Sequence, residues 1–269
     1  MKRSDRKLHK VLLASMVMTL LLGLQALAAG TRTVTMRTVN GAYISSGKDA
    51  NVKDYKTTVY HKIQVNKSGY LAVTGLSKND SGTKRNMKVV LCNSKKQVVE
   101  VLSSGTSVDA EKTRIAQYGV AKGTYYLKVS GQKNYSLAAK LVGISDKSGS
   151  SKSKAAYVAQ NAETKGLLAA GESASRADWY RFRVTKSKVL KLKLKAYGNG
   201  KMSFYVYGPS YPNGCLLKSF INGDATLRSA RGDRALKVRT GTYYIKVVRR
   251  SGNAYKKSSG MYSLKWQLV

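Results

Sequence analysis

The chain contains the tetrapeptide Gly-Thr-Tyr-Tyr twice, at residues 123–126 and again at 241–244. Each copy begins a matching stretch, GTYYLKV or GTYYIKV, and Tyr-Ser-Leu follows each, at 135–137 and 262–264. Upstream, the segment 60–65 corresponds to 179–184, so the offsets are about 119, 118 and 127 residues and the order is kept. A period of this length indicates two complete domains duplicated in tandem, not a solenoid of short repeats.

The N-terminus has the three parts of a secretory signal peptide. Five basic residues and one acid lie within the first ten positions, an apolar stretch runs from Val11 to Leu24, and Ala26-Leu27-Ala28 provides small residues at the cleavage positions. The apolar stretch is short for a membrane span. We therefore expect residues 1–28 to be removed, and the mature chain to be secreted, extracellular and without a membrane span. It would be either released or held at the cell envelope by non-covalent contacts.

The mature chain is strongly basic. Without residues 1–28 it keeps 44 basic and 12 acidic residues, a formal charge of +32 on 241 residues. Such a charge favours binding to polyanions through steering and counterion release. We expect an anionic extracellular polymer, such as teichoic acid or an acidic glycan, as the partner, and only non-specific binding to nucleic acid. General solubility is the competing explanation, although a much smaller charge already provides it.

The two cysteines do not occupy equivalent positions in the repeats. Cys92 aligns with Tyr207, whereas Cys215 falls in a loop. A disulfide would have to join the two domains, and each domain is large enough to fold without one, so two free thiols are favoured.

The boundary between the repeats is marked by a run of small and charged residues. Asp146–Lys154 has no apolar side chain and is typical of a flexible linker. We therefore predict a first domain at 31–145, a linker at 146–156 and a second domain at 157–269.

Both domains have the two-residue alternation of half-buried strands. Leu190, Leu192 and Leu194 alternate with lysines, and Tyr180 and Phe182 alternate with arginines. Gly- and Ser-rich clusters separate these short stretches, and no long helical pattern interrupts them. The fold class predicted is all-β, with two tandem antiparallel β-sandwiches of jelly-roll type, because each half-buried strand needs an apolar partner sheet.

Four motifs in the second repeat resemble those of the bacterial pre-peptidase C-terminal domain, abbreviated PPC. They are DWYRF at 178–182, the strand MSFYVYGP at 202–209, GTYYIKV at 241–247 and YSL at 262–264. The first repeat is similar but diverged, with VYHKI at 59–63 in place of DWYRF. The resemblance implies a secreted, non-catalytic β-sandwich that serves targeting or substrate binding.

Catalytic and metal-binding patterns are missing from the sequence. There is no G-x-S-x-G elbow, no H-E-x-x-H and no phosphate or calcium loop. The single mature histidine, His61, falls on the inward face of its strand. Asp178 is expected to pair with Arg176 or Arg181, or to cap the turn before its strand. We therefore expect that the protein is not an enzyme and that it has neither a cofactor nor a metal site.

The outward positions of the second repeat combine cations with aromatic rings. Aromatic rings stack on sugars or bases, and Lys and Arg neutralise anionic groups. Strand alternation assigns ten candidate ligand-binding residues to these positions: Trp179, Arg181, Arg183, Lys191, Lys193, Lys195, Tyr205, Tyr207, Tyr244 and Lys246. Whether they form one patch depends on strand order, which alternation does not provide.

These patterns predict a secreted, non-catalytic protein that attaches to anionic polymers of a cell wall or host surface through basic and aromatic sandwich faces. The alternative is a protein-interaction module that targets or regulates a separate secreted peptidase. An enzyme of an unfamiliar class is a third, less favoured hypothesis.

Overall fold

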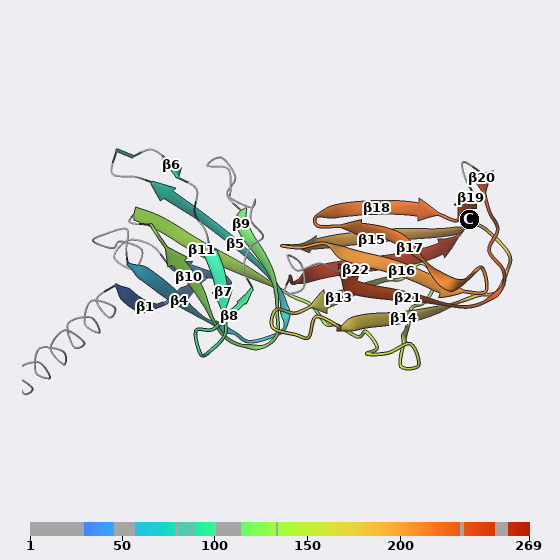
Figure 1. Ribbon diagram of the computed structural model, residues 1–269, viewed down its shortest axis with the longest axis horizontal. Helices are drawn as coiled ribbons and strands as arrows, with labels where there is room; N and C mark the ends of the chain where they lie inside the picture. Colours follow the sequence, from blue (N-terminus) through green and yellow to red (C-terminus); the bar gives the residue numbers. More distant parts are fainter. Residues whose placement is uncertain are drawn as a thin grey trace, which may run out of the picture.

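The fold consists of β-strands stacked in two successive sandwiches (Figure 1). The computed structural model describes residues 30–45, 57–78, 81–82, 84–85, 87, 89–100, 114–132, 134–231, 234–250 and 258–269. The predicted class, two tandem β-sandwiches, is confirmed. The predicted signal peptide, residues 1–28, lies outside the described residues, and none of the residues described forms a helix long and apolar enough to span a bilayer.

The first sandwich pairs sheet A with sheet B. Sheet A has the order β1(Thr31–Thr35), β4(Thr58–Val65), β10(Gly123–Ser130), β7(Val89–Cys92), β8(Val98–Glu100). Sheet B has the order β2(Arg37–Val39), β3(Ala42–Ser45), β11(Asn134–Gly143), β5(Gly69–Lys78), β6(Lys84–Arg85), and β9(Arg114–Val120) also pairs with β5. All pairings are antiparallel except that of β1 with β4, which is parallel.

The second sandwich repeats this strand order. Sheet C has the order β12(Ala156–Tyr157), β14(Ala177–Val184), β21(Gly241–Arg249), β16(Met202–Gly208), β17(Tyr211–Phe220). Sheet D has the order β13(Glu163–Leu168), β22(Gly260–Leu268), β15(Leu190–Gly198), β18(Gly223–Arg228). A small hairpin, β19(Ala230–Arg231) with β20(Arg234–Ala235), follows β18. The parallel edge strand recurs too, as β12 beside β14. Sheets A and C are therefore equivalent, as are sheets B and D.

Strand alternation decides which side chains enter the second core. Phe182 and Leu194 are buried, as predicted, while Arg181 and Lys193 next to them in sequence are exposed. Phe182 stacks on Trp266 with a centroid distance of 4.6 Å, so the two sheets meet ring against ring. Aromatic contacts of this kind add to the stabilisation that comes from burying apolar area.

The two sandwiches share a buried junction at the ends of β9 and β13. An apolar cluster there combines residues of both halves, namely Tyr70, Ile144, Leu167 and Ala169, with Ala72, Tyr197 and Met261 against them. The backbone of Gly119 in β9 comes so close to the second sandwich that a Cβ would lie 2.6 Å from the Leu168 carbonyl oxygen. The Gly119 carbonyl also accepts a hydrogen bond from Ala170 N at 2.8 Å. The contact therefore joins backbone to backbone.

A carboxyl group of the first sandwich is fully buried in this junction. Glu100 Oε1 accepts hydrogen bonds from Asn199 Nδ2 at 3.1 Å and from Ser259 N at 2.9 Å, and Glu100 Oε2 accepts one from Ser259 Oγ. Burial raises the pKa of Glu100 to about 7, although these donors and Arg249 oppose the shift. A buried ionisable group thus joins the halves.

The run that was predicted to be a flexible linker is packed against the second sandwich. Asp146 accepts hydrogen bonds from Ser148 N at 2.8 Å and from Leu167 N at 3.3 Å. Gly149 exchanges two backbone hydrogen bonds with Trp179, each 2.9 Å long. The composition of the run suggested flexibility because it lacks apolar side chains, but backbone and carboxylate hydrogen bonds hold the segment in place.

Candidate functional site

The outer face of sheet C carries seven of the ten candidate residues. They come from three neighbouring strands: Trp179, Arg181 and Arg183 on β14, Tyr244 and Lys246 on β21, and Tyr205 and Tyr207 on β16. The register places Trp179 beside Lys246, which in turn lies beside Tyr205, while Tyr244 lies between Arg181 and Tyr207. Directly opposed positions of adjacent strands lie on the same face of a sheet, so these seven form one continuous surface.

Aromatic rings on this face hold ammonium groups against them. The Trp179 and Tyr207 rings lie 5.6 Å apart with a tilt of 36°. Lys246 Nζ lies 5.5 Å from the Trp179 ring centroid, and Lys152 Nζ lies 5.1 Å from that of Tyr244 and 5.5 Å from that of Tyr207. These are cation–π distances. We call these five residues the sheet C cluster.

Lys152 is the member that sequence reasoning missed. It belongs to the run 146–154, whose composition predicts a flexible linker and not part of a site. The paired backbone bonds between Gly149 and Trp179 bring this run onto the sheet, and with it the Lys152 ammonium. No motif in the sequence marks this position, because the contact depends on how the segment folds back.

The other three candidates lie on a different sheet. Lys191, Lys193 and Lys195 project from the outer face of β15 in sheet D, on the opposite side of the sandwich from the sheet C cluster. The ten candidates therefore do not form a single patch. A single stretch of alternation shows which residues face outward, but it does not show which of the two sheets a strand joins.

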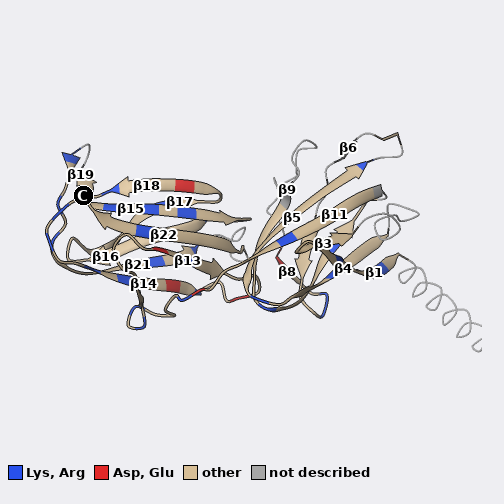
Figure 2. Cartoon of the chain, turned by 180° about the vertical axis from the view of Figure 1, so that it is seen from behind, with Lys and Arg blue, Asp and Glu red and all other residues tan. Residues whose placement is uncertain are grey.

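The two basic faces differ in their acidic neighbours. On sheet D, Lys195 lies directly across from Asp224, and Glu163 lies across from Lys265. On sheet C, the described outward positions of β14, β16 and β21 include no carboxylate, since Asp178 faces inward. Figure 2 shows more Lys and Arg than Asp and Glu along the strands of both sandwiches. The positive field is therefore less compensated on sheet C.

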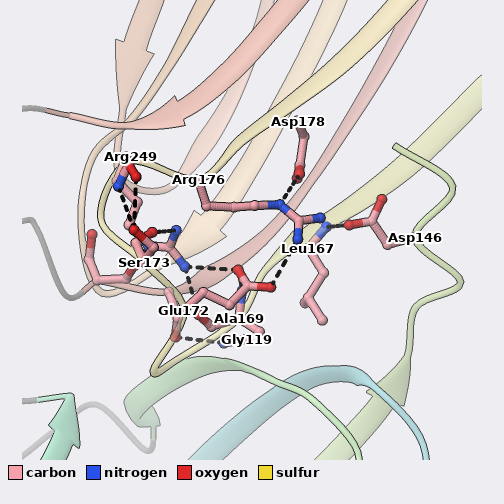
Figure 3. Close-up of polar contacts among 12 residues, drawn as sticks. Gly119, Asp146, Leu167, Ala169, Glu172, Ser173, Arg176, Asp178 and Arg249 are labelled. Atoms are coloured by element: carbon pink, nitrogen blue, oxygen red, sulfur yellow. Dashed lines mark hydrogen bonds and ion pairs between the residues drawn. The ribbon is translucent and has the colours of Figure 1, made fainter. Parts of the chain in front are cut away.

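Asp178 belongs to a structural network (Figure 3). Its carboxylate is fully buried and accepts hydrogen bonds from Arg176 Nε at 3.1 Å and from the Tyr262 hydroxyl at 2.7 Å. Burial raises the pKa of Asp178, and the neighbouring charge of Asp146 adds to the shift, while Tyr262 and Arg176 oppose it. The expected pairing with an arginine is confirmed: Arg176 binds one carboxylate oxygen, and the Tyr262 hydroxyl binds the other.

Arg249 extends this network toward the junction. Its guanidinium, almost fully buried, donates to the carbonyl oxygens of Ser258 at 2.7 Å and Ala169 at 2.6 Å, and contacts Glu172 at 3.2 Å. Glu172 also lies 3.7 Å from Arg176 (Figure 3). Buried charges require such complete pairing. These contacts hold the loop before β14 in place.

His61 occupies the inward position that alternation predicted. It is fully buried, and its Nε2 lies 2.7 Å from the Tyr135 hydroxyl. The equivalent place in the second sandwich holds the pair Tyr180 and Tyr262, whose hydroxyls lie 2.9 Å apart. Among the residues that the structure describes, no three His, Cys, Asp or Glu side chains are grouped to hold a metal ion.

Both cysteines are free thiols, as the sequence favoured. Cys92 is buried, and burial raises the pKa of its thiol. Cys215 is exposed, and the prediction that it lies in a loop is wrong, because it belongs to the strand β17.

Comparison with known proteins finds fold-level likeness only. No family model matches the chain, and no curated protein matches it. Among solved structures, the pre-peptidase C-terminal domain of a Bacillus anthracis collagenase is 19% identical, with a TM-score of 0.29 over 42% of this chain and 93% of that domain. The Salmonella Typhimurium protein PliG, a periplasmic inhibitor of g-type lysozyme, is 22% identical, with a TM-score of 0.30 over 42% of this chain and 96% of PliG.

A third match spans both sandwiches. The CUB1-EGF-CUB2 region of human MASP-1/3 is 8% identical, with a TM-score of 0.25 over 84% of this chain and all of that region. At such identities and TM-scores no function transfers from any of the three proteins. The functional argument therefore depends on the residues of the sheet faces themselves.

Proposed function

We propose that this protein is a secreted, non-catalytic binding protein that attaches to anionic polymers of a cell wall or host surface through the outer face of sheet C. The observation that supports this best is the sheet C cluster, in which two lysine ammonium groups lie over three rings on a face without a described carboxylate. The formal charge of +32 expected for the mature chain supports the same class of partner.

The rings contribute by holding the cations in place. A free lysine side chain loses rotamer freedom when it binds an anion, which weakens binding. A lysine that already lies over a ring has lost part of that freedom before the ligand arrives. Arg181 and Arg183 flank the cluster on β14 and are exposed, so they add charge that can form paired hydrogen bonds with sulfate, phosphate or carboxylate.

Two triple variants that remove the same charge test the site. One changes Arg181, Arg183 and Lys246 to Gln on sheet C, and the matched control changes Lys191, Lys193 and Lys195 to Gln on sheet D. Retention of each protein on immobilised heparin is measured over a salt series. Because each neutralised anionic group releases counterions, the logarithm of affinity should fall linearly with the logarithm of salt concentration.

The sheet C variant should bind more weakly and show a shallower slope than the sheet D variant. Equal losses in the two variants would mean a diffuse basic surface without a site. Salt-independent retention of the wild-type protein would contradict the polymer hypothesis and favour a protein partner, such as a separate secreted peptidase.

A further inference from the structure

The outer face of sheet A repeats the arrangement of the sheet C cluster. Tyr60 on β4 stands at the position equivalent to Trp179, while Tyr126 and Lys128 on β10 stand at those of Tyr244 and Lys246. The register agrees, because Lys128 lies across from Tyr60 as Lys246 lies across from Trp179. The Tyr60 and Tyr126 rings make an edge contact at 6.1 Å. The duplication has therefore kept this surface as well as the core.

The cations of this face also lie over rings. Lys96 Nζ lies 5.0 Å from the Tyr60 ring centroid and 5.6 Å from that of Tyr126, and Lys128 Nζ lies 5.9 Å from that of Tyr60. Lys62, across from Tyr126, adds a third ammonium group. The cation–π contacts thus resemble those of the second sandwich. Two features differ: the bridging lysine comes from another element, and buried Cys92 stands where the second sandwich has Tyr207.

A hydrogen-bonded turn positions Lys96, the lysine that bridges the Tyr60 and Tyr126 rings. Lys96 belongs to the turn between β7 and β8, where the Asn93 side chain accepts hydrogen bonds from the backbone N–H groups of Lys95 and Gln97, each 3.0 Å long. Lys96 Nζ donates to Thr33 Oγ1 on β1 at 2.7 Å. An ammonium has three N–H donors, so two remain on this exposed side chain for an anion.

The surroundings favour an anionic ligand. The outward positions of β1, β4 and β10 are polar, aromatic or basic and include no acid: Thr31, Thr33, Thr35, Thr58, Tyr60, Lys62, Gln64, Thr124, Tyr126, Lys128 and Ser130. Hydroxyl and amide groups beside ammonium groups and phenol rings suit a chain of sugars that carries acidic groups. The rings contact the sugar faces and the ammonium groups contact the anions.

We propose that the face formed by Tyr60, Lys62, Lys96, Tyr126 and Lys128 is a second binding site for an acidic polysaccharide. The inference deepens the proposed function, because it assigns both sandwiches to one ligand and makes the protein bivalent toward a single polymer. Two linked sites raise the affinity for a long chain above that of either site alone, because the second contact becomes intramolecular.

The test uses the full mature chain with Lys96 and Lys128 both changed to Gln. The matched control changes Lys78 and Lys140 to Gln; both are exposed on sheet B of the same sandwich and remove the same charge. Calorimetric titration with a short heparin oligosaccharide counts the sites, and titration with long heparin measures bivalent affinity. Thermal melting of all variants confirms that each is folded.

The wild-type protein and the control should bind two short oligosaccharides per chain, and the Lys96/Lys128 variant one. The affinity of the Lys96/Lys128 variant for long heparin should fall at least tenfold relative to wild type, whereas that of the control should fall less than twofold. Restoring the charge as Lys96→Arg and Lys128→Arg should recover the second site. Equal behaviour of variant and control, or two sites remaining in the variant, would overturn the inference.

A further arm separates this inference from the proposed function. Arg181→Gln with Lys246→Gln impairs the sheet C face alone. If that protein keeps two sites while the Lys96/Lys128 variant keeps one, the sheet C proposal fails and the sheet A site stands. Inorganic polyphosphate, which has no sugar rings, should bind the sheet A site more weakly than heparin of equal charge, and equal binding would contradict a polysaccharide ligand.

Discussion

The buried Glu100 carboxyl makes stability depend on pH in a direction that can be calculated. Its pKa is about 7 in the fold, against 4.5 in its ordinary setting, because burial outweighs the hydrogen bonds from Asn199 and Ser259. Below pH 4.5 the Glu100 carboxyl is protonated in both the folded and the unfolded state, and its contribution to the free energy of unfolding is fully present. Between pH 4.5 and 7 the unfolded chain releases the proton that the fold keeps, so stability falls as pH rises.

The size of the effect follows from the same two values. The difference between 4.5 and 7 corresponds to about 3 kcal/mol of unfolding free energy, lost progressively across this interval. For a chain of this length that is on the order of 10 °C in Tm. Glu100→Gln keeps the size of the side chain and resembles its neutral form, so it should remove this slope.

The assay is thermal or urea unfolding of both proteins at a series of pH values from 4 to 8. The stability of wild type relative to Glu100→Gln should drop by about 3 kcal/mol from the acidic to the neutral end. Taking the difference cancels Asp178, whose pKa burial also raises and which titrates in both proteins. Parallel stability curves for the two proteins would show that Glu100 does not hold a proton in the fold, and would refute the reasoning.

Three further predictions concern the core, the junction and the binding face. Phe182→Ala should cost about 3–5 kcal/mol in urea unfolding because it leaves a cavity against Trp266, whereas Lys193→Ala, exposed on the neighbouring sheet, should stay within about 0.5 kcal/mol; equal costs would contradict the alternation. Gly119→Ala should loosen the junction, seen as faster proteolysis between the sandwiches, since its Cβ has no room beside the Leu168 carbonyl; unchanged proteolysis would argue against close backbone contact. Trp179→Ala should weaken heparin binding with little change in salt slope, because a ring carries no charge; a slope change as large as that of a lysine variant would contradict this role.

Alternation predicted the interior of the second sandwich well. Tyr180, Phe182 and Leu194 are buried where a period of two placed them, because a strand offers only two faces and one must be apolar. The same rule could not place Lys191 relative to Trp179. Their strands lie in different sheets, and sheet membership depends on pairing between segments far apart in the chain.

Local sequence patterns cannot predict contacts between residues that are far apart in the chain. Glu100 is the last residue of the short strand β8, and its partners Asn199 and Ser259 lie 99 and 159 residues away. Part of the sheet A face can be predicted from the sequence, because the matched GTYYLKV and GTYYIKV segments align Lys128 with Lys246.

The backbone contact at Gly119 has a consequence for the length of a ligand. A junction held by close main-chain contact and the buried Glu100 fixes the separation between the outer faces of sheets A and C. This fixed separation sets the minimum length of a ligand that can contact both faces at once. Oligosaccharides shorter than the gap can reach one face at a time, so affinity measured over a ladder of chain lengths should stay flat and then rise steeply at one threshold. A flexible linker would spread that rise over many lengths.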